Sequence, residues 1–187
     1  PFKMSKRAGT FVTLRDVVDQ VGANVTRFHM LTRKNDAPLD FDLAKVLEQS
    51  RENPVFYVQY AHARVASVLH KAEDAGITAD DATLADADLT LLDHDSELGV
   101  LRKLAEWPRL VETAARSNEP HRIAFFLYDL ASDLHGLYHL GKSEMSLRFV
   151  NESSQTATHA NLALARSVSI VISAGLGILG VKPAQEM

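Results

Sequence analysis

Apolar residues recur every three or four positions along most of the chain, the spacing that gives a helix one buried face. Residues that begin or interrupt helices divide this pattern into segments. Helices are predicted from Thr13, a residue suited to an N-cap, to Gly22, on to Leu31, from Asp42 to Gln49, from Pro54 to Gly76, and over residues 96–106, 108–117, 120–139 and 154–179.

Strand signals are weak by comparison. Residues 10–14 and 39–41 offer at most a small hairpin or loop near the start of the chain. The acidic stretch over residues 78–95 predicts a loop with a short helical turn. The predicted fold class is therefore an all-α helical bundle.

The predicted helix that starts at Pro54 carries two kinds of surface. Its buried stripe is expected to consist of Val55, Val58, Ala61, Val65, Val68 and Ala72. A second ridge at the same spacing holds Tyr57, Tyr60, Arg64 and Lys71. Phenol rings beside a guanidinium suit an unstacked base and its phosphate, because the ring offers a π surface and the cation neutralises charge. Half-buried tyrosines at a helix boundary would have the same spacing, so periodicity leaves both interpretations open.

The predicted helix over residues 120–139 repeats this design. Its core face is expected to hold Ile123, Leu127, Leu130, Leu134 and Leu137. Tyr128, His135 and Tyr138 lie beside that face, and His139 follows His135 by four positions, the spacing of two zinc ligands on a helix. No Glu follows the first histidine and the chain has no Cys, so no metal site is predicted.

Residues 136–143, Gly-Leu-Tyr-His-Leu-Gly-Lys-Ser, match the P-loop pattern at every position. A P-loop must follow a buried strand and open a helix, with an Asp on a later strand helping to hold Mg²⁺. This segment continues a helical pattern, and no Asp occurs after Asp133. The match is interpreted as coincidental, with Gly141 near the end of a helix.

The composition fits a soluble globular chain. With 187 residues and 46% hydrophobic content, the chain can form one domain, or one domain and part of another. The absence of Cys fits a reducing compartment, so a cytoplasmic location is expected. The apolar stretch over residues 167–181 is shorter than the roughly 20 residues of a membrane span, and it is interpreted as a buried helix. Neither a membrane nor DNA is expected as a partner.

Charge is distributed unevenly along the chain. The formal net charge of −4 excludes a uniformly basic polyanion binder. Residues 1–71 carry +4, residues 72–107 carry −8 and residues 108–187 are neutral. Because surface potential acts within about 8–10 Å, the total charge does not decide what the first and last segments bind.

Lys3-Met4-Ser5-Lys6-Arg7 resembles the KMSKS signature of class I aminoacyl-tRNA synthetases, with Arg7 replacing the last serine. Residues 31–42, residues 53–64 (Asn-Pro-Val-Phe-Tyr-Val-Gln-Tyr-Ala-His-Ala-Arg) and residues 179–187 (Leu-Gly-Val-Lys-Pro-Ala-Gln-Glu-Met) resemble the arginyl-tRNA synthetase family. The resemblance extends over essentially the whole chain. It implies a C-terminal piece of a longer protein: residues 1–50 would end the catalytic domain, and residues 51–187 would form a helical anticodon-binding domain.

The resemblance also implies roles for the signature loop. Lys6 would stabilise the transferring phosphates of ATP, whose charge grows in the transition state, while Lys3 and Ser5 would shape the loop. The parent enzyme would use ATP with Mg²⁺ to join arginine to tRNA-Arg. The His-Ile-Gly-His signature and the arginine pocket are missing from the sequence, so this chain alone is expected not to aminoacylate.

The same resemblance implies contacts with the anticodon loop of tRNA-Arg through Tyr57, Tyr60, Arg64, Tyr138 and Met187. The acidic segment is expected to face away from the RNA, and the chain is expected to be a monomer. Two alternatives stay open: the anticodon-binding region of another class I synthetase, such as the cysteinyl enzyme, and a helical protein-interaction bundle with no nucleic acid partner.

Overall fold

The computed structural model of the chain describes residues 12–34, 36–39, 41–48, 53–151 and 153–187. The signature-loop residues Lys3, Ser5 and Lys6 lie outside this range. The helices are α1 Leu14–Val21, α2 Ala23–Met30, α3 Leu43–Leu47, α4 Pro54–Asp74, α5 Asp81–Ala85, α6 Asp95–Ser117, α7 His121–Ser143 and α8 Gln155–Ile178, with short 3-10 turns η2 Leu89–Leu91 and η3 Met145–Leu147.

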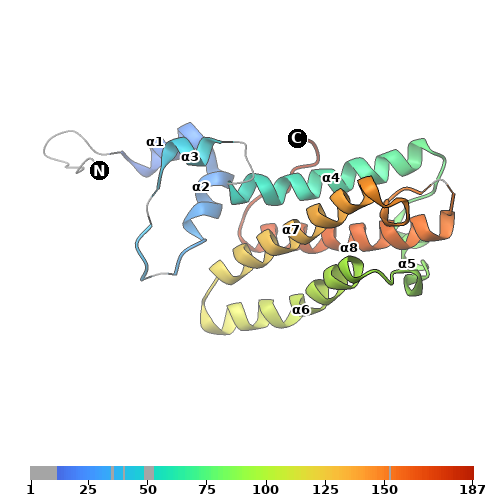
Figure 1. Ribbon diagram of the computed structural model, residues 1–187. Helices are drawn as coiled ribbons and strands as arrows, with labels where there is room; N and C mark the ends of the chain where they lie inside the picture. The colour runs from blue at the N-terminus through green and yellow to red at the C-terminus, as the bar shows by residue number, and fades with distance from the viewer. Residues whose placement is uncertain (1–11, 35, 40, 49–52, 152) are drawn as a thin grey trace, which may run out of the picture.

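Four long helices, α4, α6, α7 and α8, form the bundle (Figure 1). Helices α7 and α8 contact each other and lie between α4 and α6, while α1–α3 gather at the end of α4 where that helix begins (Figure 1). This arrangement confirms the all-α prediction. Of the segments with weak strand signals, residues 10, 11 and 40 lie outside the described residues, Leu14 begins α1, and the described part of the chain contains no strand.

The first helix begins where its sequence predicts. The Thr13 hydroxyl accepts a hydrogen bond from the backbone N–H of Asp16 (3.1 Å), and the Asp16 carboxylate accepts one from the backbone N–H of Thr13 (2.8 Å). These reciprocal bonds form a capping box. Hydrogen bonds from Thr13 hold the pKa of the Asp16 carboxyl below its usual value.

The bundle core is built from the predicted apolar stripes. All members of the two stripes predicted on α4 and α7 are buried. Helix α8 adds Leu162, Leu164, Val168, Ile172 and Leu176, all of them buried. By length and composition α8 is apolar enough to cross a membrane, but in this structure it is a central helix that packs on α4, α6 and α7.

Two helix boundaries differ from the prediction. Residues 96–106 and 108–117, predicted as separate helices, form the single helix α6 with Pro108 inside it. Proline removes one helical hydrogen bond, but packing of both halves against the bundle compensates, as where the Trp107 ring lies 5.4 Å from the Phe126 ring. Helix α7 continues past Gly141 to Ser143. Residues 136–143 are therefore helical, which confirms that the P-loop match is coincidental.

Asn53 joins the N-terminal helices to the bundle. Its side chain is 2% exposed, and its amide donates to the carbonyls of Val46 (2.6 Å) and Glu48 (3.0 Å). Its amide oxygen pairs with Nε2 of His29 on α2 (3.1 Å). Burial lowers the pKa of the His29 imidazole below its usual value, and the Asn53 bond offsets this only in part.

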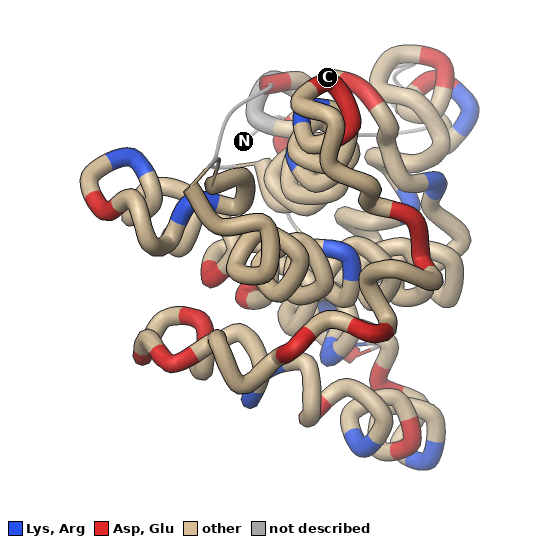
Figure 2. The backbone as a smooth tube through the Cα atoms, turned by 90° about the vertical axis from the view of Figure 1, so that its right-hand side faces the viewer, with Lys and Arg blue, Asp and Glu red and all other residues tan. Residues whose placement is uncertain are grey.

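The acidic stretch over residues 78–95 packs on α8. Helix α5 and turn η2 contact α8, and the Arg166 guanidinium on α8 donates two hydrogen bonds to the Asp81 carboxylate (2.7 and 3.0 Å). Figure 2 shows acidic positions in its lower half, where α5 and α6 lie, and also beside the C-terminus at the top, near α4.

Candidate nucleic-acid interface

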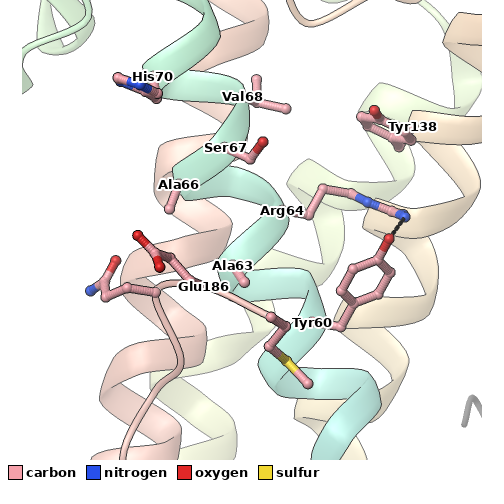
Figure 3. A pocket seen from close by; sticks show the side chains of 11 residues that line it. Tyr60, Ala63, Arg64, Ala66, Ser67, Val68, His70, Tyr138 and Glu186 are labelled. Carbon is pink, nitrogen blue, oxygen red and sulfur yellow. Dashed lines mark hydrogen bonds between the residues drawn. The ribbon is translucent and has the colours of Figure 1, made fainter. Parts of the chain in front are cut away.

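A groove of about 670 Å³ runs over the outer surface of α4. Tyr138 of α7 lies on one side of the groove and Glu186 on the other (Figure 3), and Gln185 and Met187 also line it. Its lining consists of Tyr60, Ala63, Arg64, Ala66, Ser67, Val68, His70, Tyr138, Gln185, Glu186 and Met187. The structure thus brings together four of the predicted contact residues, Tyr60, Arg64, Tyr138 and Met187, from three separate segments of the chain.

Arg64 is the centre of this groove. Its guanidinium carbon lies 4.4 Å from the centre of the Tyr60 ring and 4.3 Å from the centre of the Tyr138 ring. One guanidinium nitrogen donates a hydrogen bond to the Tyr60 hydroxyl (2.8 Å), as Figure 3 shows. The cation therefore links the two phenol rings, which come from different helices, into one aromatic and cationic surface.

A buried histidine fixes Arg64 from below. His135 on α7 is 4% exposed, and its Nδ1 lies 2.6 Å from the other guanidinium nitrogen of Arg64. A guanidinium can only donate, so Nδ1 of His135 accepts and Nε2 carries the hydrogen that bonds the backbone carbonyl of Tyr57 (3.3 Å). The residue considered as half of a zinc pair is instead part of this network, and in the described part of the chain no group of His, Asp or Glu side chains is arranged to hold a metal ion.

Tyr57 lies under the groove and is not part of its surface. The side chain is 9% exposed, and its ring packs 5.0 Å from the Tyr128 ring and 4.6 Å from the His135 ring. The predicted ridge of Tyr57, Tyr60, Arg64 and Lys71 is therefore not one continuous exposed surface. Position 57 turns toward α7 because the neighbouring helix covers that part of the circumference of α4, which a single-helix pattern cannot show.

A second hollow of about 370 Å³ continues from the groove past Tyr138 and Val68. It is lined by Lys71 of α4, Lys142 of α7 and Arg148 beyond η3, all exposed. Sequence reasoning named Lys71 but missed the other two as candidates. The sequence pointed to Lys142 only as part of the rejected P-loop pattern. Arg148 follows a turn, so no helical spacing predicts that it lies beside α4.

Backbone packing brings that second hollow close to α7. A Cβ on Gly141 would lie 2.8 Å from the backbone oxygen of Leu147, so a side chain there would push the turn away. The Arg148 guanidinium donates to the Gly141 carbonyl (3.0 Å). Gly141 thus permits close approach of the turn, and it lies in the last turn of α7, near the helix end as predicted.

This arrangement is suited to binding. The exposed Tyr60 ring and the half-buried Tyr138 ring can stack on bases, while guanidinium and ammonium groups can neutralise phosphates. The cations that line the two hollows are Arg64, Lys71, Lys142 and Arg148, and they are accompanied by the Glu186 carboxylate and the His70 imidazole. A single-stranded loop with its bases turned outward matches this combination of rings and cations better than a duplex does.

Comparison with known proteins gives consistent matches. The family described as DALR anticodon binding domain matches residues 58–187. The chain is 80% identical over 186 residues to an arginine–tRNA ligase of Ruegeria sp. (strain TM1040) and 69% identical to one of Paracoccus denitrificans, in each case covering 100% of this chain and 32% of the relative. The chain therefore spans about a third of the length of these curated relatives.

Solved structures share the fold. A Campylobacter jejuni protein described as a candidate arginyl-tRNA synthetase aligns over 100% of this chain and 38% of its own, with a TM-score of 0.82 and 28% identity. The Thermus thermophilus arginyl-tRNA synthetase aligns over 97% of this chain and 29% of its own, with a TM-score of 0.70. At 23% identity the second likeness shows the fold alone.

Proposed function

The chain belongs to the DALR anticodon binding domain family, and from that premise we propose that it binds the anticodon stem-loop of tRNA-Arg as the C-terminal part of an arginine–tRNA ligase. The observation that carries the proposal is the assembly of Tyr60, Arg64 and Tyr138 into one surface beside Met187. Such a surface offers what an unpaired loop presents: bases to stack and phosphates to neutralise.

Each contact residue has a task in this proposal. Tyr60 and Tyr138 stack on bases, with each stacked base contributing about 1–3 kcal/mol. Arg64 contacts a base edge or phosphate while holding both rings, and Met187 packs its flexible thioether against a base. Tyr57 contributes by supporting His135 from beneath, since its carbonyl accepts the imidazole hydrogen. Lys71, Lys142 and Arg148 attract the phosphates that flank the loop.

The catalytic part of the proposal concerns residues outside the described range. Lys6 stabilises the phosphates of ATP during arginine activation, with Lys3 and Ser5 shaping the loop, and residues 1–50 belong to the catalytic domain. The parent protein binds ATP with Mg²⁺, arginine and tRNA-Arg, and acts as a cytoplasmic monomer. The present chain alone does not aminoacylate, a statement that arginine- and tRNA-dependent AMP release by the isolated chain would overturn.

The cysteinyl alternative is less well supported than the arginyl proposal. The relatives named above are arginine–tRNA ligases at 80% and 69% identity. The decisive measurement is a charging assay with the full-length parent, offering arginine and cysteine with their tRNAs. Charging of cysteine instead of arginine would refute the arginyl proposal and support the cysteinyl alternative.

A protein-interaction bundle without an RNA partner predicts different binding behaviour. We propose titrating the chain into a fluorescent anticodon stem-loop of tRNA-Arg and into the same stem-loop with a changed anticodon. The expected result is tighter binding of the first RNA, with an affinity that falls steeply as salt is raised, by about 0.7 log units per log unit of salt for each single-strand phosphate contact. Equal binding of both RNAs would refute anticodon recognition, and no binding at low salt would favour the protein-interaction alternative.

A further inference from the structure

The chain after α8 turns back and runs along α4. We call residues 181–187 the C-terminal strap. Gly180 makes the turn with a φ of 68°, in the left-handed region, and Val181 is buried with its N–H bonded to the Leu176 carbonyl (2.8 Å). The strap then crosses to the surface of α4 (Figure 1), so that residues 185–187 reach the groove.

Two polar side chains of α4 donate hydrogen bonds to backbone carbonyls of the strap. Gln59 donates from its amide nitrogen to the Lys182 carbonyl (3.0 Å), and His62 donates from Nδ1 to the Ala184 carbonyl (2.7 Å). The two donors are three residues apart on one face of α4, and the two acceptors are two residues apart in the strap, outside any helix. The His62 side chain is 5% exposed, which shields its bond from water.

The residues directly after these two hydrogen bonds form one wall of the groove. Ala184 is the last strap residue held by α4 in this way, and the next three residues line the groove opposite Tyr138. Those three residues are exposed, so burial of their own side chains does not hold them there. The position of this wall therefore depends on the backbone bonds immediately before it.

We propose that His62 and Gln59 are positioning residues that hold the C-terminal strap as a fixed wall of the groove and so keep Met187 beside Tyr60 before any RNA arrives. A wall that is already ordered loses less conformational entropy when a ligand binds. The part of this inference that concerns RNA affinity rests on the proposed function, whereas the placement of the strap does not.

The placement is tested without RNA. The chain has 4 methionines, and selective ¹³C labelling of their methyl groups lets the Met187 signal be assigned by its absence from a variant truncated after Ala184. In His62→Leu the chemical shift of the Met187 methyl should move toward that of a mobile chain end, and its line width should narrow. His62→Asn, whose amide nitrogen can replace Nδ1, should keep the native signal. An unchanged Met187 signal in both His62→Leu and the half-buried Gln59→Leu would overturn the proposal.

The effect on RNA binding is tested with the anticodon stem-loop of tRNA-Arg as the probe. Loss of the His62 bond should weaken binding roughly fivefold, as expected for one shielded hydrogen bond. In the chain truncated after Ala184, the same substitution should have no further effect, because His62 acts only through the strap. A fivefold loss that persists after truncation would refute the positioning role.

The two proposals fail in different ways. If the unmodified chain does not bind the stem-loop, the proposed function fails, while the methyl signals still decide whether His62 and Gln59 hold the strap. If the strap is released in His62→Leu and stem-loop binding is unchanged, the strap is not a functional wall and this inference is overturned.

Discussion

Replacing Tyr60 by Ala is the sharpest test of the groove. Its side chain is 44% exposed, with the Arg64 guanidinium 4.4 Å from the ring centre and the His135 ring 5.4 Å away. Much of the ring therefore remains open to a base. Loss of one stacked base corresponds to about 1–3 kcal/mol, or roughly a fivefold to hundredfold loss of affinity.

The two functions of this side chain can be separated with Tyr60→Phe. This variant keeps the ring and removes only the hydroxyl that accepts from Arg64 (2.8 Å). One hydrogen bond at an exposed site contributes about 0.5–1 kcal/mol, so the loss should be roughly twofold to fivefold. The affinities should therefore fall in the order native chain, Tyr60→Phe, Tyr60→Ala.

The assay is fluorescence anisotropy with a labelled anticodon stem-loop of tRNA-Arg at one fixed salt concentration. Phe125→Ala serves as the matched control, because Phe125 is also an exposed aromatic residue but lies outside the groove on α7. Circular dichroism should show that each variant keeps its helices, since substitution of exposed side chains usually changes stability by only about 0.5 kcal/mol. Unchanged affinity in a folded Tyr60→Ala would remove Tyr60 from the site.

Three further predictions concern the scaffold. Gly175→Ala should lower the free energy of unfolding by about 1–3 kcal/mol, because the added Cβ would lie 2.7 Å from Leu127 Cδ2 and 3.0 Å from Trp107. Urea titration measures this change, and a variant as stable as the native chain would contradict the packing. Asn53→Ala should lower the free energy of unfolding by about 1–3 kcal/mol, because the Val46 carbonyl and the His29 imidazole lose their hydrogen bonds to Asn53. A loss near zero would show that Asn53 does not stabilise the contact between the N-terminal helices and the bundle. Burial lowers the pKa of His29, so below about pH 6.5 the unfolded chain binds more protons than the folded chain. The free energy of unfolding should therefore fall as the solution is acidified. The fall should be smaller in His29→Phe, which lacks this titrating group.

The sequence predicted the fold well where a single helix carries the information. The stripes on α4 and α7 were identifiable from spacing alone, because the helical period fixes which side chains share a face. It failed at Pro108, where the local rule predicts a break but packing on the bundle sustains one helix. It placed Gly141 near the end of a helix, as found, but it could not show the close approach of Leu147, which depends on how the turn after α7 folds back.

The candidate site was predicted in part for the same reason. Spacing and family resemblance together named Tyr60, Arg64 and Tyr138, which the structure brings into one groove. Spacing also grouped Tyr57 with them, although α7 covers that side chain. The role of His135 as acceptor for Arg64 was missed, since that bond joins residues far apart in the sequence.

The sequence by itself determined the helical class, the buried stripes and the residue types that can meet an RNA loop, because these depend on local spacing and side-chain chemistry. Only the tertiary structure decided which of those side chains stay exposed and which segments meet. The Arg64 contact with Tyr138 joins two helices, and the bond from His62 to Ala184 joins α4 to a segment far away in the chain. Such contacts depend on how whole helices pack, and no local pattern specifies them.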